Sequence, residues 1–159
     1  MKKLIFISIT FLLSYGLSAQ SEGQTLSKSK TELIKNEVDS IFQKMIVFAE
    51  KLDFNALSSG VDDTHEAGFI TNGKYYSDYI SLVNDLKLAA QGISRQAISV
   101  NEKKITVLSD RIVLMTASGI SKAYITDGRE LTINFHWSFV YEKMDNNWKV
   151  IYSHQSTTR

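Results

Sequence analysis

The chain contains no cysteine among its 159 residues. That absence excludes disulfides, thiolate metal sites, a cysteine nucleophile and a lipid-modified cysteine at a cleavage site. The sequence also lacks a glycine-rich phosphate loop, a Gly-x-Ser-x-Gly elbow and a His-Glu-x-x-His motif, which removes several common classes of enzyme. Without disulfides the domain depends on its apolar core, and 43% of the residues are hydrophobic, which is sufficient at this length.

Excess charge is also missing, because 18 basic residues stand against 17 acidic ones. Removal of Lys2 and Lys3 with a leader would leave 16 basic residues. A nearly neutral chain without a basic stripe argues against nucleic acid or an anionic membrane as the main partner.

The first 19 residues have the layout of a secretory signal peptide. A basic start at Lys2 and Lys3 precedes the largely apolar run 4–17, and the small residue Ala19 ends a plausible cleavage site. The apolar run is too short for a comfortable transmembrane helix, although an uncleaved membrane anchor is the alternative. We therefore expect export to the periplasm or the cell exterior, with no membrane attachment after cleavage.

Residues 20–28 are small and polar, as in a flexible linker, so a single domain is expected over 29–159. Ser29 and Glu32 have the spacing of a capping box, and apolar residues then recur at helical spacing up to Leu52. This pattern predicts one long amphipathic helix. A short helix is expected over 53–57, and a third helix is expected from a cap at Ser77 to a stop at Gly92.

The remaining pattern predicts strands. A short strand over 66–70 precedes the tight-turn pair Asn72-Gly73. After Gly92 we expect strands at 93–100, 105–108, 112–123, 129–143 and 148–155, with a polar turn at 101–104. Helices followed by a meander predict an α+β domain whose helices pack on one face of a curved sheet.

The C-terminal stretch carries the most informative pattern. An aromatic-rich strand over 137–143 leads through an acidic turn to Trp148, and a basic-apolar run then ends in His154-Gln155-Ser156. This stretch resembles the closing hairpin of SnoaL-like domains in the nuclear transport factor 2-like superfamily. The segments 108–113 and 126–129 are similar to turns of that family, and the order of elements matches over 30–156. Asn147 departs from the pattern, since a glycine is more usual there.

The resemblance implies a cone-shaped, cystatin-like fold with a long N-terminal helix and shorter helices packed on a strongly curved antiparallel sheet. A conical cavity would lie between helices and sheet, and two copies would pair through the outer face of the sheet. Over 129–143 the odd-numbered side chains are mostly apolar and the even-numbered ones are semi-polar. The first set fits an inner face, and the second fits a homodimer interface or a wet face.

The three histidines are the natural general acids or bases near neutral pH. Alternation along the last strand puts Tyr152 and His154 in register with Trp148. If these side chains face the cavity, His154 lies near its rim. The alternative is a histidine held by a backbone or serine partner. His136 is expected to point to the opposite face from Trp137.

His65 follows Asp62 and Asp63 and precedes Glu66, which is acidic enough to suggest a metal site. No second cluster of ligands supports it, so no metal and no cofactor are predicted.

Four further residues are candidates for the cavity. The Tyr76 hydroxyl could donate to a developing oxyanion, or simply sit at a wet rim. Trp137 and Phe139 would line an apolar cavity, or fill it. Some enzymes of this superfamily carry an acidic catalytic residue where Asp53 stands, and the alternative is an ordinary helix-terminating residue.

Three functions stay open. The first is an exported binding module whose aromatic-lined cavity accepts a small apolar or aromatic ligand, with contacts from the residues Tyr76, Trp137, Phe139, Tyr152 and His154. The second is a cofactor-independent isomerase, dehydratase or hydrolase with His154 or Asp53 as base and Tyr76 as donor. The third is a plain dimeric interaction domain. A binding module needs an open cavity, an enzyme needs a perturbed acid or base inside it, and an interaction domain predicts a filled one.

Overall fold

The computed structural model describes residues 26–158. The helices are α1 (Lys28–Glu50), α2 (Phe54–Ser59) and α3 (Tyr79–Ala89), with the short strands β1 (Phe69–Thr71) and β2 (Lys74–Tyr76) before α3. Four long strands follow: β3 (Ile93–Val107), β4 (Ile112–Ile125), β5 (Glu130–Met144) and β6 (Asn147–Thr158). No helix within 26–158 is long and apolar enough to cross a membrane. The predicted signal peptide lies outside the described residues, and export stays a prediction.

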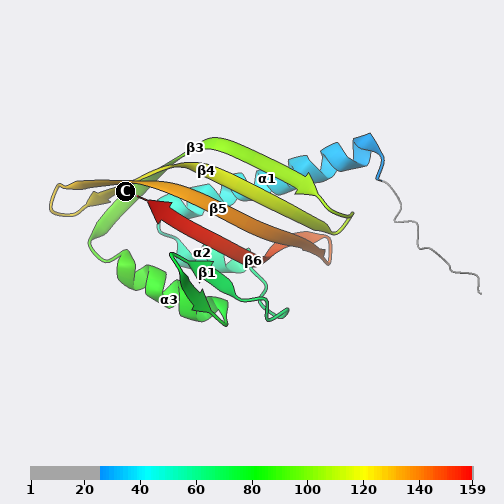
Figure 1. Ribbon diagram of the computed structural model, residues 1–159. Helices are drawn as coiled ribbons and strands as arrows, with labels where there is room; N and C mark the ends of the chain where they lie inside the picture. The colour runs from blue at the N-terminus through cyan, green and yellow to red at the C-terminus, as the bar shows by residue number, and fades with distance from the viewer. Residues whose placement is uncertain (1–25, 159) are drawn as a thin grey trace, which may run out of the picture.

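The strands form one six-stranded sheet in the order β2-β1-β6-β5-β4-β3 (Figure 1). Neighbouring strands are antiparallel except for β1 and β6, which run parallel. Figure 1 shows β3 to β6 as a meander of long strands, with α1 extending along them and α3 beside the short strands. The α+β class and the predicted order of the three helices are confirmed. The sheet is mixed rather than antiparallel, and four long strands follow α3 in place of the five expected.

The N-cap of helix α1 lies two residues earlier than predicted, at Ser27 instead of Ser29. The Ser27 hydroxyl, not that of Ser29, accepts the N–H of Lys30 at 3.3 Å, which satisfies one free donor of the first turn. Glu32, predicted to close a capping box, instead pairs with Lys35 at 2.7 Å. The boundary was missed because both serines are good caps, and only the chain path selects between them.

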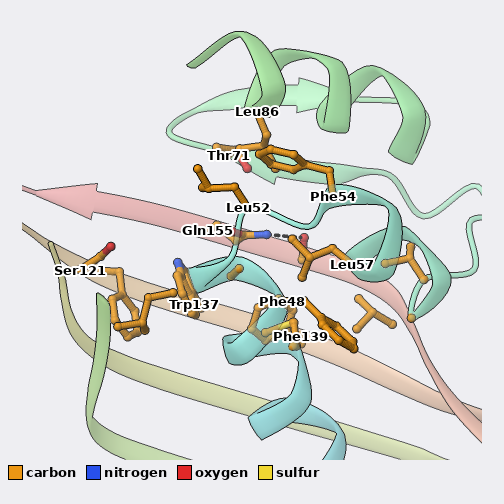
Figure 2. A pocket seen from close by; sticks show the side chains of 18 of the residues that line it. Phe48, Leu52, Phe54, Leu57, Thr71, Leu86, Ser121, Trp137, Phe139 and Gln155 are labelled. Atoms are coloured by element: carbon orange, nitrogen blue, oxygen red, sulfur yellow. Dashed lines mark hydrogen bonds between the residues drawn. The ribbon is translucent and has the colours of Figure 1, made fainter. Parts of the chain in front are cut away.

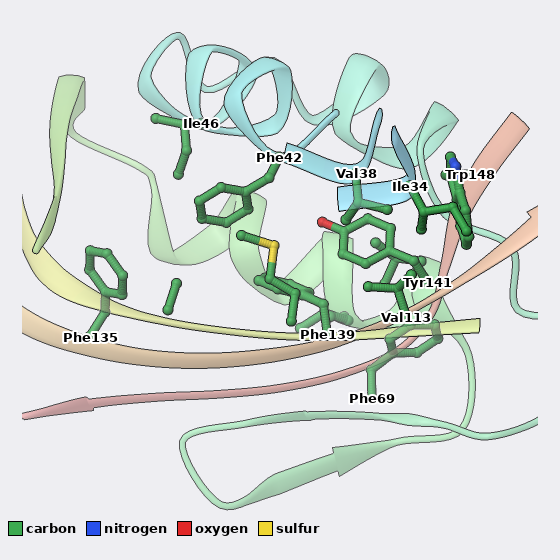
Figure 3. Packing of buried hydrophobic residues seen from close by; sticks show 14 of the residues in the cluster. Ile34, Val38, Phe42, Ile46, Phe69, Val113, Phe135, Phe139, Tyr141 and Trp148 are labelled. Atoms are coloured by element: carbon green, nitrogen blue, oxygen red, sulfur yellow. The ribbon is translucent and has the colours of Figure 1, made fainter. Parts of the chain in front are cut away.

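One stripe of α1 builds the core. Its buried residues Ile34, Val38, Phe42 and Ile46 recur every four positions, so they form one face of the helix. This stripe packs against inner-facing side chains of the sheet (Figure 3), namely Phe69, Val113, Met115, Phe135, Phe139, Tyr141 and Trp148. The rings of Phe42 and Phe139 lie 6.2 Å apart across this interface.

The predicted turn at 101–104 is wrong, because β3 continues through it and pairs with β4 on both sides. The polar run is tolerated within a strand since its side chains are exposed, and a register irregularity between Val100 and Glu102 absorbs the change. The turn at Asn72 and Gly73 is confirmed, with positive φ angles of 48° and 80°. The third helix is capped by Asp78 rather than Ser77.

A β-bulge in β6 changes which side chains face inward. Val140 pairs with Tyr152 and Tyr141 pairs with Val150, so Ile151 has no partner on β5. One extra residue on a strand reverses the alternation of the side chains that follow it. Before the bulge Val150 faces the core, and after it Ser153 is the buried residue.

Gly119 on β4 provides a test of how closely the long strands pack. A Cβ at this position would overlap the Ser99 carbonyl oxygen and would lie 2.7 Å from the Phe135 ring. Because the first contact is backbone, the strands would have to separate. We expect Gly119→Ala to lower the free energy of unfolding by about 2 kcal/mol, measured by urea denaturation. Gly60→Ala is the control, since that Cβ would make only a 3.4 Å contact. Equal stability of the two variants would contradict this packing.

Glu37 joins α1 to the closing hairpin. Its Oε2 accepts hydrogen bonds from Trp148 Nε1 at 2.7 Å and from Lys143 Nζ at 2.9 Å. The bond from Trp148, followed by that from Lys143, lowers the pKa of the Glu37 carboxyl below 4.5 in the folded protein. Deprotonated Glu37 is therefore favoured by folding.

The two hydrogen bonds to Glu37 predict that part of the folding free energy is lost in acid. A carboxyl whose folded pKa is lowered stabilises the protein above its unfolded pKa, and that contribution is lost as the pH falls through the folded pKa. We expect Glu37→Gln to be less stable than wild type by about 1 kcal/mol at neutral pH. The difference should shrink as the pH falls from 4.5, the unfolded pKa. Urea titrations over a pH series measure it. Glu32→Gln serves as control because exposed ion pairs contribute little. A stability difference between Glu37→Gln and wild type that does not change with pH would contradict this role of Glu37.

Candidate functional site

A pocket of about 400 Å³ lies between the helices and the inner face of the sheet (Figure 2). Its walls come from the C-terminal half of α1, from α2 and α3, and from strands β3 to β6. The walls are mainly apolar and include Ile41, Met45, Phe48, Leu52, Phe54, Leu57, Leu86, Ile93, Ile98, Ile133, Phe135, Trp137 and Phe139.

The pocket begins where α1 stops filling the space above the sheet. Val38 and Phe42, in the middle of the helix, have no exposed surface. Phe48 and Leu52, near its C-terminal end, are half-buried and line the pocket. The core is therefore closed under the first part of α1 and open under its last turns.

Apart from Lys44, the polar groups in the walls are uncharged and belong mainly to amides and hydroxyls. Gln96 donates from Nε2 to the Ala49 carbonyl oxygen at 2.6 Å, and its Oε1 lies 3.4 Å from the Ser121 hydroxyl. Gln155 donates from Nε2 to the Ser153 hydroxyl at 3.3 Å. These contacts leave hydrogen-bonding capacity on both glutamines, since each amide has two donor hydrogens and an acceptor oxygen.

Lys44 is the one charged residue among the described residues that line the pocket, and it is exposed. Burial raises the pKa of Tyr79 to about 12, and burial also raises the pKa of Tyr141. Both phenols are therefore neutral near physiological pH. No histidine, aspartate or glutamate lines the pocket within the described chain, and residues 26–158 hold no cluster of three or more potential metal ligands.

Trp137 and Phe139 line the pocket, as the sequence predicted of their position. The Trp137 ring stacks on Phe135, with centroids 3.9 Å apart and planes at 20°. Phe139 meets the same indole edge to face, with centroids 6.2 Å apart. The aromatic wall on β5 is therefore a continuous, mutually packed surface.

The prediction that Tyr152 and His154 share the face of Trp148 is wrong. The bulge at Ile151 reverses the alternation between them, so His154 lies opposite Ser138 on the outer face and is exposed. Neither residue lines the pocket. His136 is on the outer face too, as alternation predicted.

Tyr76 and Asp53 also lie away from the pocket walls. The Tyr76 hydroxyl donates to Asp85 Oδ2 at 2.9 Å, and Lys74 pairs with the same carboxylate, which ties β2 to α3. Asp53 caps α2 by accepting the N–H of Ala56 at 3.0 Å. Asp53 thus begins the second helix, rather than terminating the first as the alternative to a catalytic acid had it.

The loop histidine, His65, contacts an acidic residue outside its own loop. Its Nε2 lies 2.7 Å from Glu142 Oε2, and Arg111 contacts the other oxygen of that carboxylate at 3.2 Å. The loop is thereby fastened to β5.

Sequence reasoning missed the polar residues of the pocket, above all Gln155. Its place follows from the bulge, and the one local sign of a bulge is the run Val150-Ile151-Tyr152. Three consecutive apolar residues break the alternation of a half-buried strand.

The outer face of the sheet carries a second hollow with polar walls. Its side chains come from four strands and include Glu102, Lys104, Thr116, Ser118, His136, Ser138, His154 and Ser156. Pairing of two copies through this face stays a prediction.

Three solved structures share this fold over most of their length. A nuclear transport factor 2-like superfamily protein from Salmonella enterica serovar Typhimurium superposes with a TM-score of 0.71 at 15% identity, covering 81% of this chain and 94% of that one. A candidate scytalone dehydratase from Novosphingobium aromaticivorans gives 0.74 at 9% identity, over 84% and 89%. Hexachlorocyclohexane dehydrochlorinase LinA-type3 from Novosphingobium barchaimii gives 0.67 at 14% identity, over 84% and 92%.

At such low identities these similarities establish the fold and not the activity. No curated protein sequence matches the chain. Residues 38–159 match the family model of the SnoaL-like domain. The matched range includes the four long strands, with the pocket wall on β5, and the C-terminal half of α1. The chain therefore belongs to the SnoaL-like domain family.

Proposed function

We propose that this protein binds a small, uncharged, apolar or aromatic molecule in the pocket between its helices and its sheet. The observation that carries the proposal is the composition of the walls, which are apolar with amides and hydroxyls but with a single charged side chain, Lys44. Pockets for small ligands span roughly 300–1,000 Å³ and combine apolar walls with a few polar groups. A volume of about 400 Å³ suits a ligand of two or three fused rings.

The neutral walls also bear on the charge of the ligand. An ionised group moved from water into an apolar site loses most of its solvation unless a partner compensates. Lys44 is exposed, so it cannot compensate a charge deep in the pocket. A neutral ligand loses least on entry.

A proton-transfer enzyme is the second candidate, because two structural neighbours are named for a dehydratase and a dehydrochlorinase. Such catalysis needs an acid or base within hydrogen-bond reach of the substrate. Asp53, Tyr76 and His154, the candidates for that role, are not among the pocket residues. Binding without proton transfer therefore agrees better with the side chains that face inward.

Filling the pocket should weaken binding. We expect the uncharged fluorescent probe N-phenyl-1-naphthylamine to bind the purified protein, and Leu86→Trp to weaken that binding at least about tenfold, because the larger side chain occupies space beside Leu86 in the wall. The readout is probe emission during titration, with circular dichroism to verify folding. His154→Ala is the matched control and should bind as wild type does, since His154 is on the outer face. A folded Leu86→Trp protein with wild-type affinity, or no binding by wild type, would overturn the proposal.

Binding should also be insensitive to pH. Burial raises the pKa of Tyr79 to about 12, so its phenol stays protonated up to about pH 9. No wall group among the described residues is a histidine. The dissociation constant of the probe should therefore be constant from about pH 6 to about pH 9. Titrations across that range measure it. A transition centred near about pH 6.5 would indicate a histidine at the site and would favour the enzyme.

A further inference from the structure

We propose that the indole N–H of Trp137 selects the ligand by donating a hydrogen bond to an uncharged carbonyl oxygen. The ligand class is then an apolar ring compound that carries a ketone or amide group. This inference rests on the proposed function and adds to it the chemical group that the pocket recognises.

The first support is the fixed direction of the indole. Trp137 stacks almost parallel on Phe135, at 3.9 Å and 20°, and Phe139 packs edge to face against it. Aromatic packing on two sides resists rotation of the ring. The N–H is therefore held in one orientation before any ligand arrives, which reduces the entropy lost on binding.

The second support is that this donor is unused. The other tryptophan, Trp148, donates to Glu37 at 2.7 Å, whereas Trp137 makes no side-chain hydrogen bond within residues 26–158. Thr71 Oγ1 and Tyr141 Oη are the side-chain polar atoms of the described chain that are both fully buried and unpartnered. The Trp137 nitrogen is not one of them, so it keeps some accessible surface, and the residue lines the pocket.

The third support is the surroundings of the nitrogen. Figure 2 shows the indole nitrogen on the side of the ring nearest Leu52 and Gln155. Gln155 is the direct cross-strand partner of Trp137, and its own Nε2 is engaged by Ser153. A donor between apolar Leu52 and the Gln155 amide, with no hydrogen bond of its own within the described residues, favours a ligand that brings an acceptor, because a ligand without one leaves the donor desolvated and unpaired.

The acceptor is uncharged because the pocket holds no buried cation, among the described residues, that would compensate a negative charge. A carboxylate at Trp137 would have no cation among the wall residues except exposed Lys44. A carbonyl oxygen accepts the same hydrogen bond and carries no such desolvation cost.

The test compares 9-fluorenone with fluorene, which have the same ring system and differ in a carbonyl against a methylene. Each compound displaces N-phenyl-1-naphthylamine from wild type, from Trp137→Phe and from Trp148→Phe. We expect wild type to bind 9-fluorenone about tenfold more tightly than fluorene. Trp137→Phe should bind both about equally, and Trp148→Phe should keep the preference, because Trp148 is not a pocket residue.

A second readout needs no substitution in the pocket. The chain has two tryptophans, so a nitrogen–proton correlation spectrum shows two indole signals, assigned from Trp148→Phe. The Trp137 indole proton should move downfield with 9-fluorenone relative to fluorene, since ring-current effects of the two compounds are alike and the hydrogen bond is the difference.

The outcomes separate this inference from the proposed function. Equal affinities of the two compounds for wild type, or an unchanged preference in Trp137→Phe, overturn the role of Trp137 while the pocket function stands. Displacement by neither compound from a protein that binds the amine probe also overturns it. Failure of the amine probe itself to bind overturns the proposed function instead.

Discussion

The packing of α1 on the inner face of the long strands is the contact on which the other elements depend. Val38 and Phe42 are completely buried against the sheet, with the Phe42 ring 6.2 Å from that of Phe139. Burial of such side chains is the main favourable contribution to the folding free energy, and this chain has no cysteine with which to form a disulfide. The buried stripe ends at Ile46, before the helix does, and Phe48 and Leu52 are half-buried. The pocket is the space that this helix does not fill.

The chemistry of that space depends on one unpaired residue. Because Ile151 is bulged out of the ladder, Gln155 faces the pocket and His154 faces outward. Without the bulge an imidazole would occupy the wall in place of an amide. An imidazole titrates near neutral pH and an amide does not. The one extra residue on β6 therefore places an amide in the pocket wall, where regular alternation would place an imidazole.

The shared fold leaves the choice between binding and proton transfer open. Structures with 9% and 14% identity to the chain superpose with TM-scores of 0.74 and 0.67, although few side chains are shared. Shape is conserved where backbone pairing and apolar burial define it, while function resides in the groups that project into the cavity. In this chain those groups are a packed aromatic wall on β5, two glutamines and several hydroxyls.

Local pattern was sufficient for the stripe of α1, the Asn72-Gly73 turn, the strands β4 to β6 and the inward side of Trp137 and Phe139. Helical spacing, turn residues and alternation are properties of neighbouring residues, so the sequence by itself determined these features. Tertiary structure alone decided the continuity of β3, the parallel pairing of β1 with β6 and the bulge at Ile151. Each depends on which residues of distant strands pair, and pairing is chosen by packing of the whole sheet. The same packing left the pocket open.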